Sequence, residues 1–218
     1  MLHNEIDLDI YLIRHAESEM NEKPHLIAGR SPHSPLSIKG QDQAKSLGRY
    51  FKKEPVIFDS VYSSPLLRSK RTAQITLDEM GIPERDIIEV PELVEFTQGD
   101  WEGRPRKEVY TPEILRYINT KGSLFTPPNG ESQIMVEHRV SGWFMEEILH
   151  NNKLMSGKKT IAIFSHGLTI KCFLHFVMNF DERLIYRIRL DNTGYCKLHF
   201  NQEGWFMYSI NTTSHLYI

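Results

Sequence analysis

The stretch Asp9-Ile-Tyr-Leu-Ile13, followed at once by Arg14-His15, decides the fold of this chain. An apolar run of this length is typical of a buried strand. At its carboxyl end the strand delivers a guanidinium and an imidazole together. Arginine stays charged and can grip two oxygens of an anion, and a neutral imidazole can act as a nucleophile. The pair therefore predicts a strand that ends at an oxyanion site, although a surface pair at a strand end is the plainer alternative.

Strands and helices alternate in the sequence after this first strand. We expect strands at 8–13, 56–62, 86–90 and 159–165, and a hairpin made of 195–200 and 205–210. We expect helices at 38–51 with Ser37 as N-cap, from Pro65 towards Met80, and at 108–119, 131–151 and 168–178. Such alternation predicts an α/β fold of three layers, α/β/α, with a mostly parallel central sheet. Residues 1–218 are expected to form one domain, in which 96–130 lie over the site.

Composition limits the class of protein. The chain has 218 residues, of which 40% are hydrophobic and 25% charged, with a formal net charge of −2. This balance argues against nucleic-acid binding, so any anion site must be local. Cys172 and Cys196 are too few for a disulfide framework, and we expect buried free thiols. Residues 1–7 lack the features of a secretory signal, and the apolar stretch from Cys172 to Phe180 is too short to span a membrane, so we expect a cytoplasmic protein.

Three further segments carry groups that suit the same site. Strand 159–165 ends at His166-Gly167, and ligands gather at the carboxyl ends of strands in open α/β sheets. Arg68 falls in the first turn of a helix, where the helix dipole disfavours a positive charge. Its presence at this unfavourable position indicates a functional role. When a phosphoester breaks, a carboxyl group must protonate the leaving oxygen. The candidates on spacing alone are Glu92, Glu95, Asp100 and Glu102.

Taken together, these segments resemble the histidine phosphatase superfamily, whose fold is phosphoglycerate mutase-like. Within it they resemble the branch with α-ribazole phosphatase and broad-specificity phosphomonoesterases. The matching segments are Leu12-Ile-Arg-His-Ala-Glu-Ser18 with Asn21, Pro35-Leu-Ser-Ile-Lys-Gly40, Ser63-Ser-Pro-Leu-Leu-Arg68, Glu95 with Gly99-Asp-Trp-Glu-Gly103, Asn129-Gly-Glu-Ser132, Ser165-His-Gly167 and Asp191-Asn-Thr193. They occur in the family's order and cover nearly the whole chain.

The resemblance implies a role for each matched residue. His15 is the expected nucleophile, which becomes a phosphohistidine, and Glu95 is the expected general acid. The expected clamp around the phosphoryl group consists of Arg14, Arg68 and His166, with Asn21 as a further donor. Neither a metal nor a cofactor is implied, because two guanidiniums and an imidazole supply the positive charge.

One segment departs from the family pattern. Gly29-Arg-Ser-Pro-His-Ser-Pro-Leu-Ser37 is one residue longer than the common form and lacks its Asp. Because this loop borders the expected pocket, we treat Arg30 and His33 only as candidate substrate contacts. The Ala16 that follows His15 replaces a usual Gly, which is a frequent variant with little consequence.

The spacing after Glu95 favours hydrolysis over phosphoryl transfer to a sugar acid. His166 follows Glu95 by 71 positions, whereas cofactor-dependent phosphoglycerate mutases carry a longer insertion there, which keeps water out. A phosphoenzyme open to water hydrolyses. We therefore expect a phosphatase acting on small-molecule phosphomonoesters, with a mutase as the alternative. A non-catalytic phosphate-binding module is disfavoured because every catalytic position is occupied, and a metallohydrolase because no His-x-His or His-Glu-x-x-His spacing occurs.

The substrate's organic part stays open at this stage, as does the oligomeric state. A second acidic group on the substrate would suit the basic side chains of Arg104, Arg106 and Lys107, although an ordinary solvated loop explains them equally. Bulky organic phosphates would suit the apolar neighbours Phe96, Trp101 and Tyr110.

Overall fold

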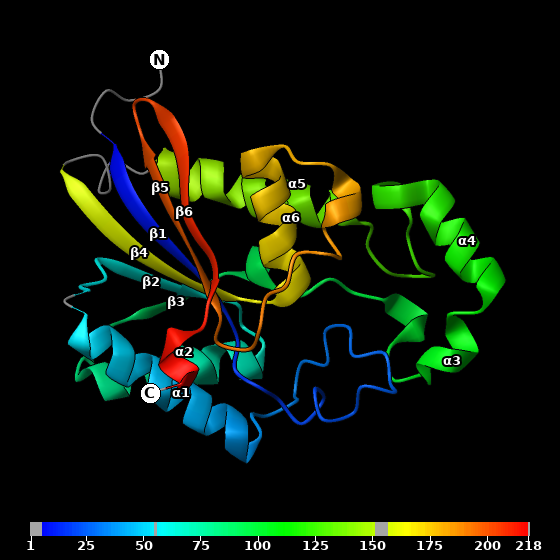
Figure 1. Ribbon diagram of the computed structural model, residues 1–218, viewed down its shortest axis with the longest axis horizontal. Coiled ribbons are helices and arrows are strands. Elements are labelled where there is room, and N and C mark those ends of the chain that lie inside the picture. The colour runs from blue at the N-terminus through cyan, green and yellow to red at the C-terminus, as the bar shows by residue number, and fades with distance from the viewer. Residues whose placement is uncertain (1–5, 55, 151–156, 218) are drawn as a thin grey trace.

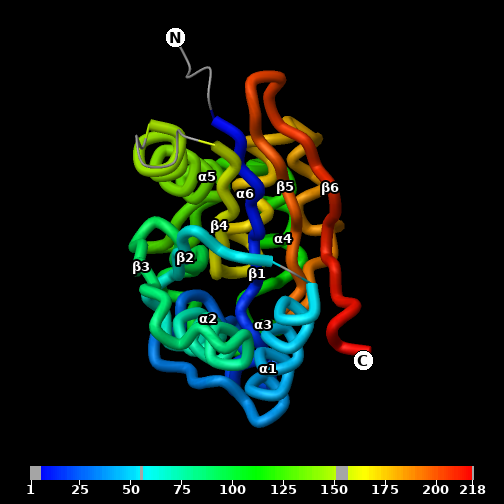
Figure 2. Tube along the Cα trace, turned by 90° about the vertical axis from the view of Figure 1, so that its left-hand side faces the viewer, coloured from blue at the N-terminus to red at the C-terminus, as the bar shows by residue number. Residues whose placement is uncertain are grey.

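The computed structural model describes residues 6–54, 56–150 and 157–217. A six-stranded sheet runs through it in the order β3-β2-β4-β1-β5-β6, which can be followed from side to side in Figure 2. The strands are β1 (Asp7–Arg14), β2 (Ser60–Ser63), β3 (Ile87–Glu89), β4 (Lys158–Ser165), β5 (Tyr195–Asn201) and β6 (Gly204–Thr212). The first four in this spatial order pair in parallel, and β5 and β6 add an antiparallel edge. The expectation of a mostly parallel α/β sheet is confirmed.

Helices cover both faces of the sheet, as Figure 1 shows, with α1 and α2 on one side and α5 and α6 on the other. The helices are α1 (Ile38–Lys53), α2 (Leu67–Met80), α3 (Arg106–Val109), α4 (Pro112–Lys121), α5 (Gln133–Trp143) and α6 (Gly167–Met178). Side chains of a strand alternate between faces. In β1, Leu8 and Leu12 pack in the cluster under α5 and α6, whereas Tyr11 and Ile13 pack in the cluster under α1 and α2.

Most of the expected elements are present, with shifted ends. Ser37 caps α1 by accepting a hydrogen bond from the amide of Gly40 at 3.0 Å, as expected. The hairpin of β5 and β6 is also confirmed. Strand β2 begins only at Ser60, and α2 begins two residues after Pro65. Both sequence predictions therefore started these elements too early.

Two expected helices are interrupted. The helix expected at 108–119 is split into α3 and α4, because Thr111 caps α4 through its side chain and Pro112 occupies the first helical position. The helix expected at 131–151 begins at Gln133 and changes after Trp143 into a π-helical turn, Phe144–Leu149. Its expected last residue, Asn151, lies outside the described residues, as do residues 1–5 of the N-terminal segment.

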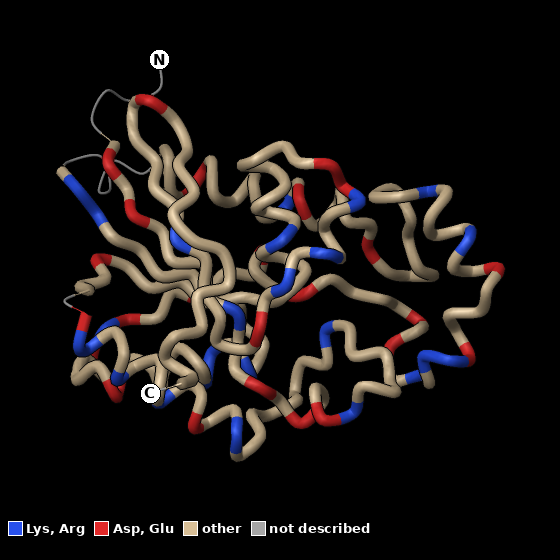
Figure 3. The backbone as a smooth tube through the Cα atoms, viewed as in Figure 1, with Lys and Arg blue, Asp and Glu red and all other residues tan. Residues whose placement is uncertain are grey.

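Charge and cysteine placement agree with the composition. In the view of Figure 3, basic and acidic positions are interspersed along the whole trace, in keeping with the small net charge. Cys172 and Cys196 are buried and unpaired, as expected. Among the described residues no helix has the length and apolar character needed to cross a membrane.

Candidate active site

The register of the two central strands brings two histidines together. Strands β1 and β4 are neighbours, and Arg14 pairs with Ser165 in the ladder. His15 and His166 therefore follow at the same edge of the sheet, with ring centroids 5.1 Å apart. Both side chains are buried, with 3% and 0% of their surface exposed. The expectation that two strand ends meet at one site is confirmed.

The hydrogen bonds of His15 fix its tautomer. Nδ1 lies 2.7 Å from the carbonyl oxygen of Ala16, and because a carbonyl only accepts, Nδ1 carries the proton. The Nε of Arg68 donates to Nε2 across 3.2 Å, so Nε2 holds the lone pair. Burial, together with the charges of Arg68 and Arg14, holds the pKa of His15 well below its usual range. The imidazole is therefore neutral and presents a lone pair.

Arg68, the second residue of α2, is held by a loop from a distant part of the chain. Its Nη1 donates to the carbonyl oxygens of Arg30 at 2.7 Å and Ser31 at 3.1 Å. Burial lowers the pKa of Arg68 to about 10, with Glu95 acting in the opposite sense and Arg14 in the same sense. The guanidinium thus stays charged at neutral pH. Its carbonyl partners offset the unfavourable place of a cation at a helix N-terminus.

Arg14 has spare hydrogen-bonding capacity. Its Nη1 donates to the carbonyl oxygen of Leu190 at 2.6 Å, but its buried Nε finds no partner among the described residues. Gly167 lies beside it, and a Cβ on that glycine would come to 3.5 Å from the Nε of Arg14. A buried N–H without a partner is costly. The arrangement therefore suits an anion that accepts from Arg14.

His166 precedes the first residue of α6 and is held by Ser64. Its Nε2 lies 2.8 Å from Ser64 Oγ, and its Nδ1 is buried with no partner among the described residues. Burial and then the charge of Arg68 hold the pKa of His166 well below its usual range. Like His15, this imidazole is therefore neutral.

The carboxylate of Glu95 is docked on the start of α6. It accepts from the amides of Phe96 at 2.9 Å and of Leu168 and Thr169 at 3.3 Å each, and Thr169 Oγ1 lies 3.2 Å from the same carboxylate. A helix N-terminus favours negative charge. The side chain of Glu95 is thereby fixed in one orientation beside α6.

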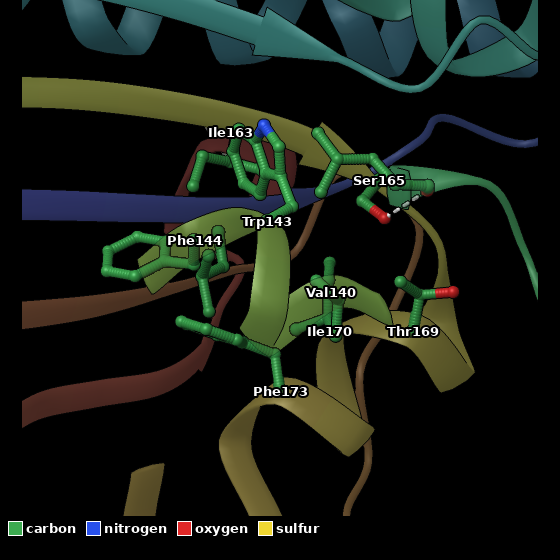
Figure 4. Close-up of a pocket in the computed structure, with 10 residues that line it drawn as sticks. Val140, Trp143, Phe144, Ile163, Ser165, Thr169, Ile170 and Phe173 are labelled. Atoms are coloured by element: carbon green, nitrogen blue, oxygen red, sulfur yellow. Dashed lines mark hydrogen bonds between the residues drawn. The ribbon is translucent and has the colours of Figure 1, made fainter. Parts of the chain in front are cut away.

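Two side chains from the core hold the backbone before Glu95 in place by hydrogen bonds. Ser165 Oγ donates to the carbonyl oxygen of Leu93 and Thr169 Oγ1 to that of Val94, both at 2.8 Å. Figure 4 shows Ser165 and Thr169 at the polar edge of a small pocket in the apolar core, between β4 and α6. These two hydroxyls position the segment that carries Glu95.

A cleft of about 650 Å³ joins these groups. Its lining includes Arg14, His15, Asn21, Arg68, Glu95 and Arg106. The side-chain oxygen Oδ1 of Asn21 is engaged, since it accepts from the backbone amide of Ser18 at 3.0 Å. His166 lies beside His15 without lining the cleft. Among the described residues, the further candidates from the sequence that stay outside its lining are Arg30, His33, Arg104 and Lys107.

The four candidate carboxylates separate clearly in the structure. Glu95 is the one acidic residue that the described part of the chain contributes to the cleft. Glu102 connects two backbone segments, because its carboxylate accepts from the amides of Arg30 and Gln98 at 3.1 and 3.0 Å. Asp100 accepts from the exposed side chain of Asn129 at 2.9 Å, and Glu92 is absent from the lining.

Some contributors to the site were not singled out in the sequence. Ser64, Thr169 and Asn192 are examples, and Asn192 donates from its side chain to the carbonyl oxygen of His15 at 2.9 Å. Ser64 and Asn192 lie inside segments that carry the family resemblance, so their place in those segments is a signal. Among the described residues no cluster of three or more His, Cys, Asp or Glu side chains is arranged to hold a metal ion.

Comparison with known proteins agrees with this geometry. A 2,3-bisphosphoglycerate-dependent phosphoglycerate mutase from Parvibaculum lavamentivorans is 31% identical over 176 residues, which are 79% of this chain and 80% of that protein. The uncharacterized phosphatase PhoE of Bacillus subtilis is 30% identical over 207 residues, 95% of this chain and 96% of its own. The structure of a phosphoglycerate mutase from Bacillus anthracis has the same fold, with a TM-score of 0.81, 20% identity, and coverage of 98% of this chain and 97% of that one.

The family model of the histidine phosphatase superfamily, branch 1, matches residues 10–213, from the middle of β1 to just beyond the end of β6. This match spans every group gathered at the cleft. With its fold, its two facing histidines and its relatives in agreement, the chain belongs to branch 1 of the histidine phosphatase superfamily.

Proposed function

We propose that this protein is a phosphohydrolase that cleaves phosphomonoesters through a phosphohistidine on His15. The observation that carries the proposal is the neutral imidazole of His15, whose Nε2 lone pair lies at the cleft beside Arg68. A nucleophile needs a neutral ring and an electron pair, and His15 has both, with the pair on Nε2 accepting from Arg68 until a phosphoryl oxygen takes over that N–H.

In the first step, Nε2 of His15 attacks phosphorus and the bond from phosphorus to the ester oxygen breaks. Glu95 gives its proton to the departing oxygen, which leaves as an alcohol. In the second step, the Glu95 carboxylate takes a proton from water while the water oxygen attacks phosphorus. The P–N bond then breaks, which releases inorganic phosphate and restores His15. Glu95 thus serves first as acid and then as base.

The negative charge on the transferring group is met by fixed donors. Arg14 and Arg68 supply two guanidiniums, and Asn21 and His166 are the further members of the clamp. Charge builds up on the equatorial oxygens in a phosphoryl transition state, so donors already in place lower the barrier. In this scheme the chain's own cations do what a metal ion does in other phosphatases.

Two features favour water as the acceptor. The interval of 71 positions between Glu95 and His166 leaves little chain for a seal over the phosphoenzyme. The cleft of about 650 Å³ also holds a small ester together with water, whose share of liquid volume is about 30 Å³ per molecule. A wet phosphohistidine hydrolyses.

A phosphoglycerate mutase is the second candidate. It is favoured by one observation, the 31% identity to a 2,3-bisphosphoglycerate-dependent phosphoglycerate mutase over 79% of the chain. In that reaction the phosphohistidine would return its phosphoryl group to a sugar acid, and 2,3-bisphosphoglycerate would charge His15.

The intermediate is tested by quenching the enzyme after mixing it with ³²P-labelled substrate. Because P–N bonds are acid-labile, alkaline quench should preserve protein-bound label and acid quench should remove it. His15→Ala should carry no label, whereas exposed His33→Ala should label normally. Label that persists in His15→Ala would place the nucleophile elsewhere.

The acceptor is tested on one preparation by two assays. Phosphate release from a panel of monoesters is compared with interconversion of 3- and 2-phosphoglycerate in the presence of 2,3-bisphosphoglycerate. We expect release to dominate, with kcat/KM of about 10⁴ M⁻¹s⁻¹ or more on a good substrate. If interconversion is much faster than phosphate release, the protein is a mutase and the hydrolase proposal is wrong. If neither reaction occurs on a broad panel, the protein is a non-catalytic phosphate-binding module.

A further inference from the structure

Lys171 is a lysine at the cleft without a hydrogen bond or an ion pair to any described residue. It lies on α6, one turn after Gly167 and Leu168, and all three residues line the cleft. Its side chain is partly buried, yet no described residue accepts from it. Partial burial disfavours the charged form of a lysine, and it lowers the pKa of Lys171 from its usual value. Such a group is stabilised when an anion enters the cleft.

The charges at the cleft do not balance with a phosphoryl group alone. The described lining contains four basic side chains, Arg14, Arg68, Arg106 and Lys171, and one acidic side chain, Glu95, so its formal charge is +3 with Glu95 ionised and +4 with Glu95 protonated as the acid. Both histidines are neutral. A phosphomonoester brings a charge between about −1.5 and −2 at neutral pH. A phosphoryl group alone therefore leaves an excess of positive charge at the cleft, and one further negative charge on the substrate would reduce it.

The position of Lys171 on α6 determines which part of a bound substrate it can contact. Glu95 is held by the amides of Leu168 and Thr169, so the leaving oxygen that Glu95 protonates lies beside the first turn of α6. Lys171 lies about 4.5 Å further along the helix axis than Leu168, from a rise of about 1.5 Å per residue. The charges of Arg14 and of Glu95 both act on Lys171, so it lies beside the leaving oxygen and within reach of the organic part of the ester.

The other cation on that side is less available. Arg106 comes from α3, donates from Nε to the carbonyl oxygen of Leu26 at 3.2 Å, and stacks over the ring of Tyr110 at 5.6 Å. Its charge adds to the field at the cleft, while its orientation is already fixed by these contacts. Within the described lining, Lys171 is the cation whose donors are all free.

We propose that Lys171 binds a carboxylate on the organic part of the substrate, a few bonds from the ester oxygen. The proposal rests on the phosphomonoester site proposed above, and it narrows the substrates to phosphorylated organic acids. Lys171 is thus the residue that distinguishes an acidic monoester from a neutral one.

The test uses two ligands that differ at one carbon. In 3-phosphoglycerate a carboxylate stands where glycerol 3-phosphate has a hydroxymethyl group. Dissociation constants for both are measured by calorimetry in His15→Ala protein, which cannot turn either ligand over, and in the same protein carrying Lys171→Met, Lys171→Arg or Lys107→Met. Lys107 is exposed on α3 outside the cleft lining and provides a matched charge control.

We expect the preference for 3-phosphoglycerate over glycerol 3-phosphate to fall at least about tenfold in Lys171→Met, because this variant loses the charge-assisted hydrogen bond to the carboxylate. Lys171→Arg should keep most of the preference, and Lys107→Met should keep all of it. An unchanged ratio in Lys171→Met, or an equal fall in Lys107→Met, overturns the proposal. If the ratio behaves as expected but the protein with His15 intact releases no phosphate, the hydrolase proposal fails and the carboxylate site stands.

Discussion

The Nε of Arg68 donates to Nε2 of His15 across 3.2 Å, so the clamp and the candidate nucleophile are already in contact before any ligand enters. This contact has two effects. It keeps the lone pair of His15 on the nitrogen at the cleft, and it keeps a guanidinium at the point where a phosphoryl group would arrive. An incoming phosphoryl oxygen would take over the N–H of Arg68 and free Nε2 for attack.

We predict that Arg68→Lys lowers kcat by about 10²–10³, the typical cost of losing one fixed donor in a transition state. Lysine keeps the charge but has one nitrogen in place of the planar fork, in which Nη1 reaches the two backbone carbonyls while Nε points to the place of the phosphoryl group. Steady-state kinetics measures the effect, with Arg71→Lys as the control, because Arg71 lies exposed on the same helix and donates to Gln74. A similar loss in both variants would mean that α2 is disturbed and the clamp role is unsupported.

We predict that Glu95→Gln slows the hydrolysis of alkyl phosphates far more than that of p-nitrophenyl phosphate. The nitrophenolate leaves without a proton, so it depends less on a general acid. The ratio of kcat values on the two esters is the measurement. Asp100→Asn, which changes an exposed carboxylate outside the cleft, should leave that ratio unchanged. Equal losses on both esters in Glu95→Gln would make Glu95 structural.

His215 should make the folded state less stable in acid. It is 1% exposed, its Nε2 lies 2.9 Å from Thr193 Oγ1, and burial lowers its pKa to about 4. The unfolded chain binds a proton near pH 6.5 and the folded chain only near pH 4, so stability falls as the pH drops through that window. Between about pH 7 and pH 5 we expect the wild type to lose about 2 kcal/mol more than His215→Gln.

Urea unfolding of both proteins at the two pH values measures this difference. Exposed His33→Gln serves as the control and should follow the wild type. The same acid sensitivity in His215→Gln would mean that other groups cause the loss.

Gly29→Ala should destabilise the fold and also weaken catalysis. Gly29 has a φ of +50°, and a Cβ there would lie 2.1 Å from the Cδ of Glu102. Glu102 cannot move away freely, because it accepts from the amide of Arg30 and two groups of the 97–98 segment. The same loop supplies the carbonyl partners of Arg68, so its displacement would loosen the clamp.

Gly103→Ala is the matched control for this prediction. Gly103 also has a positive φ, +80°, but nothing in the described part of the chain lies within 4 Å of its would-be Cβ. We expect Gly29→Ala to cost about 1–3 kcal/mol more than Gly103→Ala in denaturant unfolding, because only the former displaces hydrogen-bonded groups. Equal costs would show that backbone strain alone matters at both positions.

The sequence by itself determined the strands whose ends carry the site. Apolar runs that end in Arg14-His15 and in His166 are local patterns, and burial of a central strand depends mainly on its own residues. The sequence also predicted that parallel strands would bring these ends to one edge, as the pairing of β1 with β4 confirms.

Residue type and spacing left four candidate carboxylates open, the family resemblance favoured Glu95, and the tertiary structure shows the physical difference between them. The environment of Glu95 comes from α6, more than 70 positions later, where Leu168 and Thr169 supply the donors. Lys171 gave no signal in the sequence, because it lies inside an apolar helix and its free ammonium is visible only beside the cleft. Local pattern determines which residues form each element. Contacts between distant segments decide which polar side chains share a cavity and which of them remain without a partner.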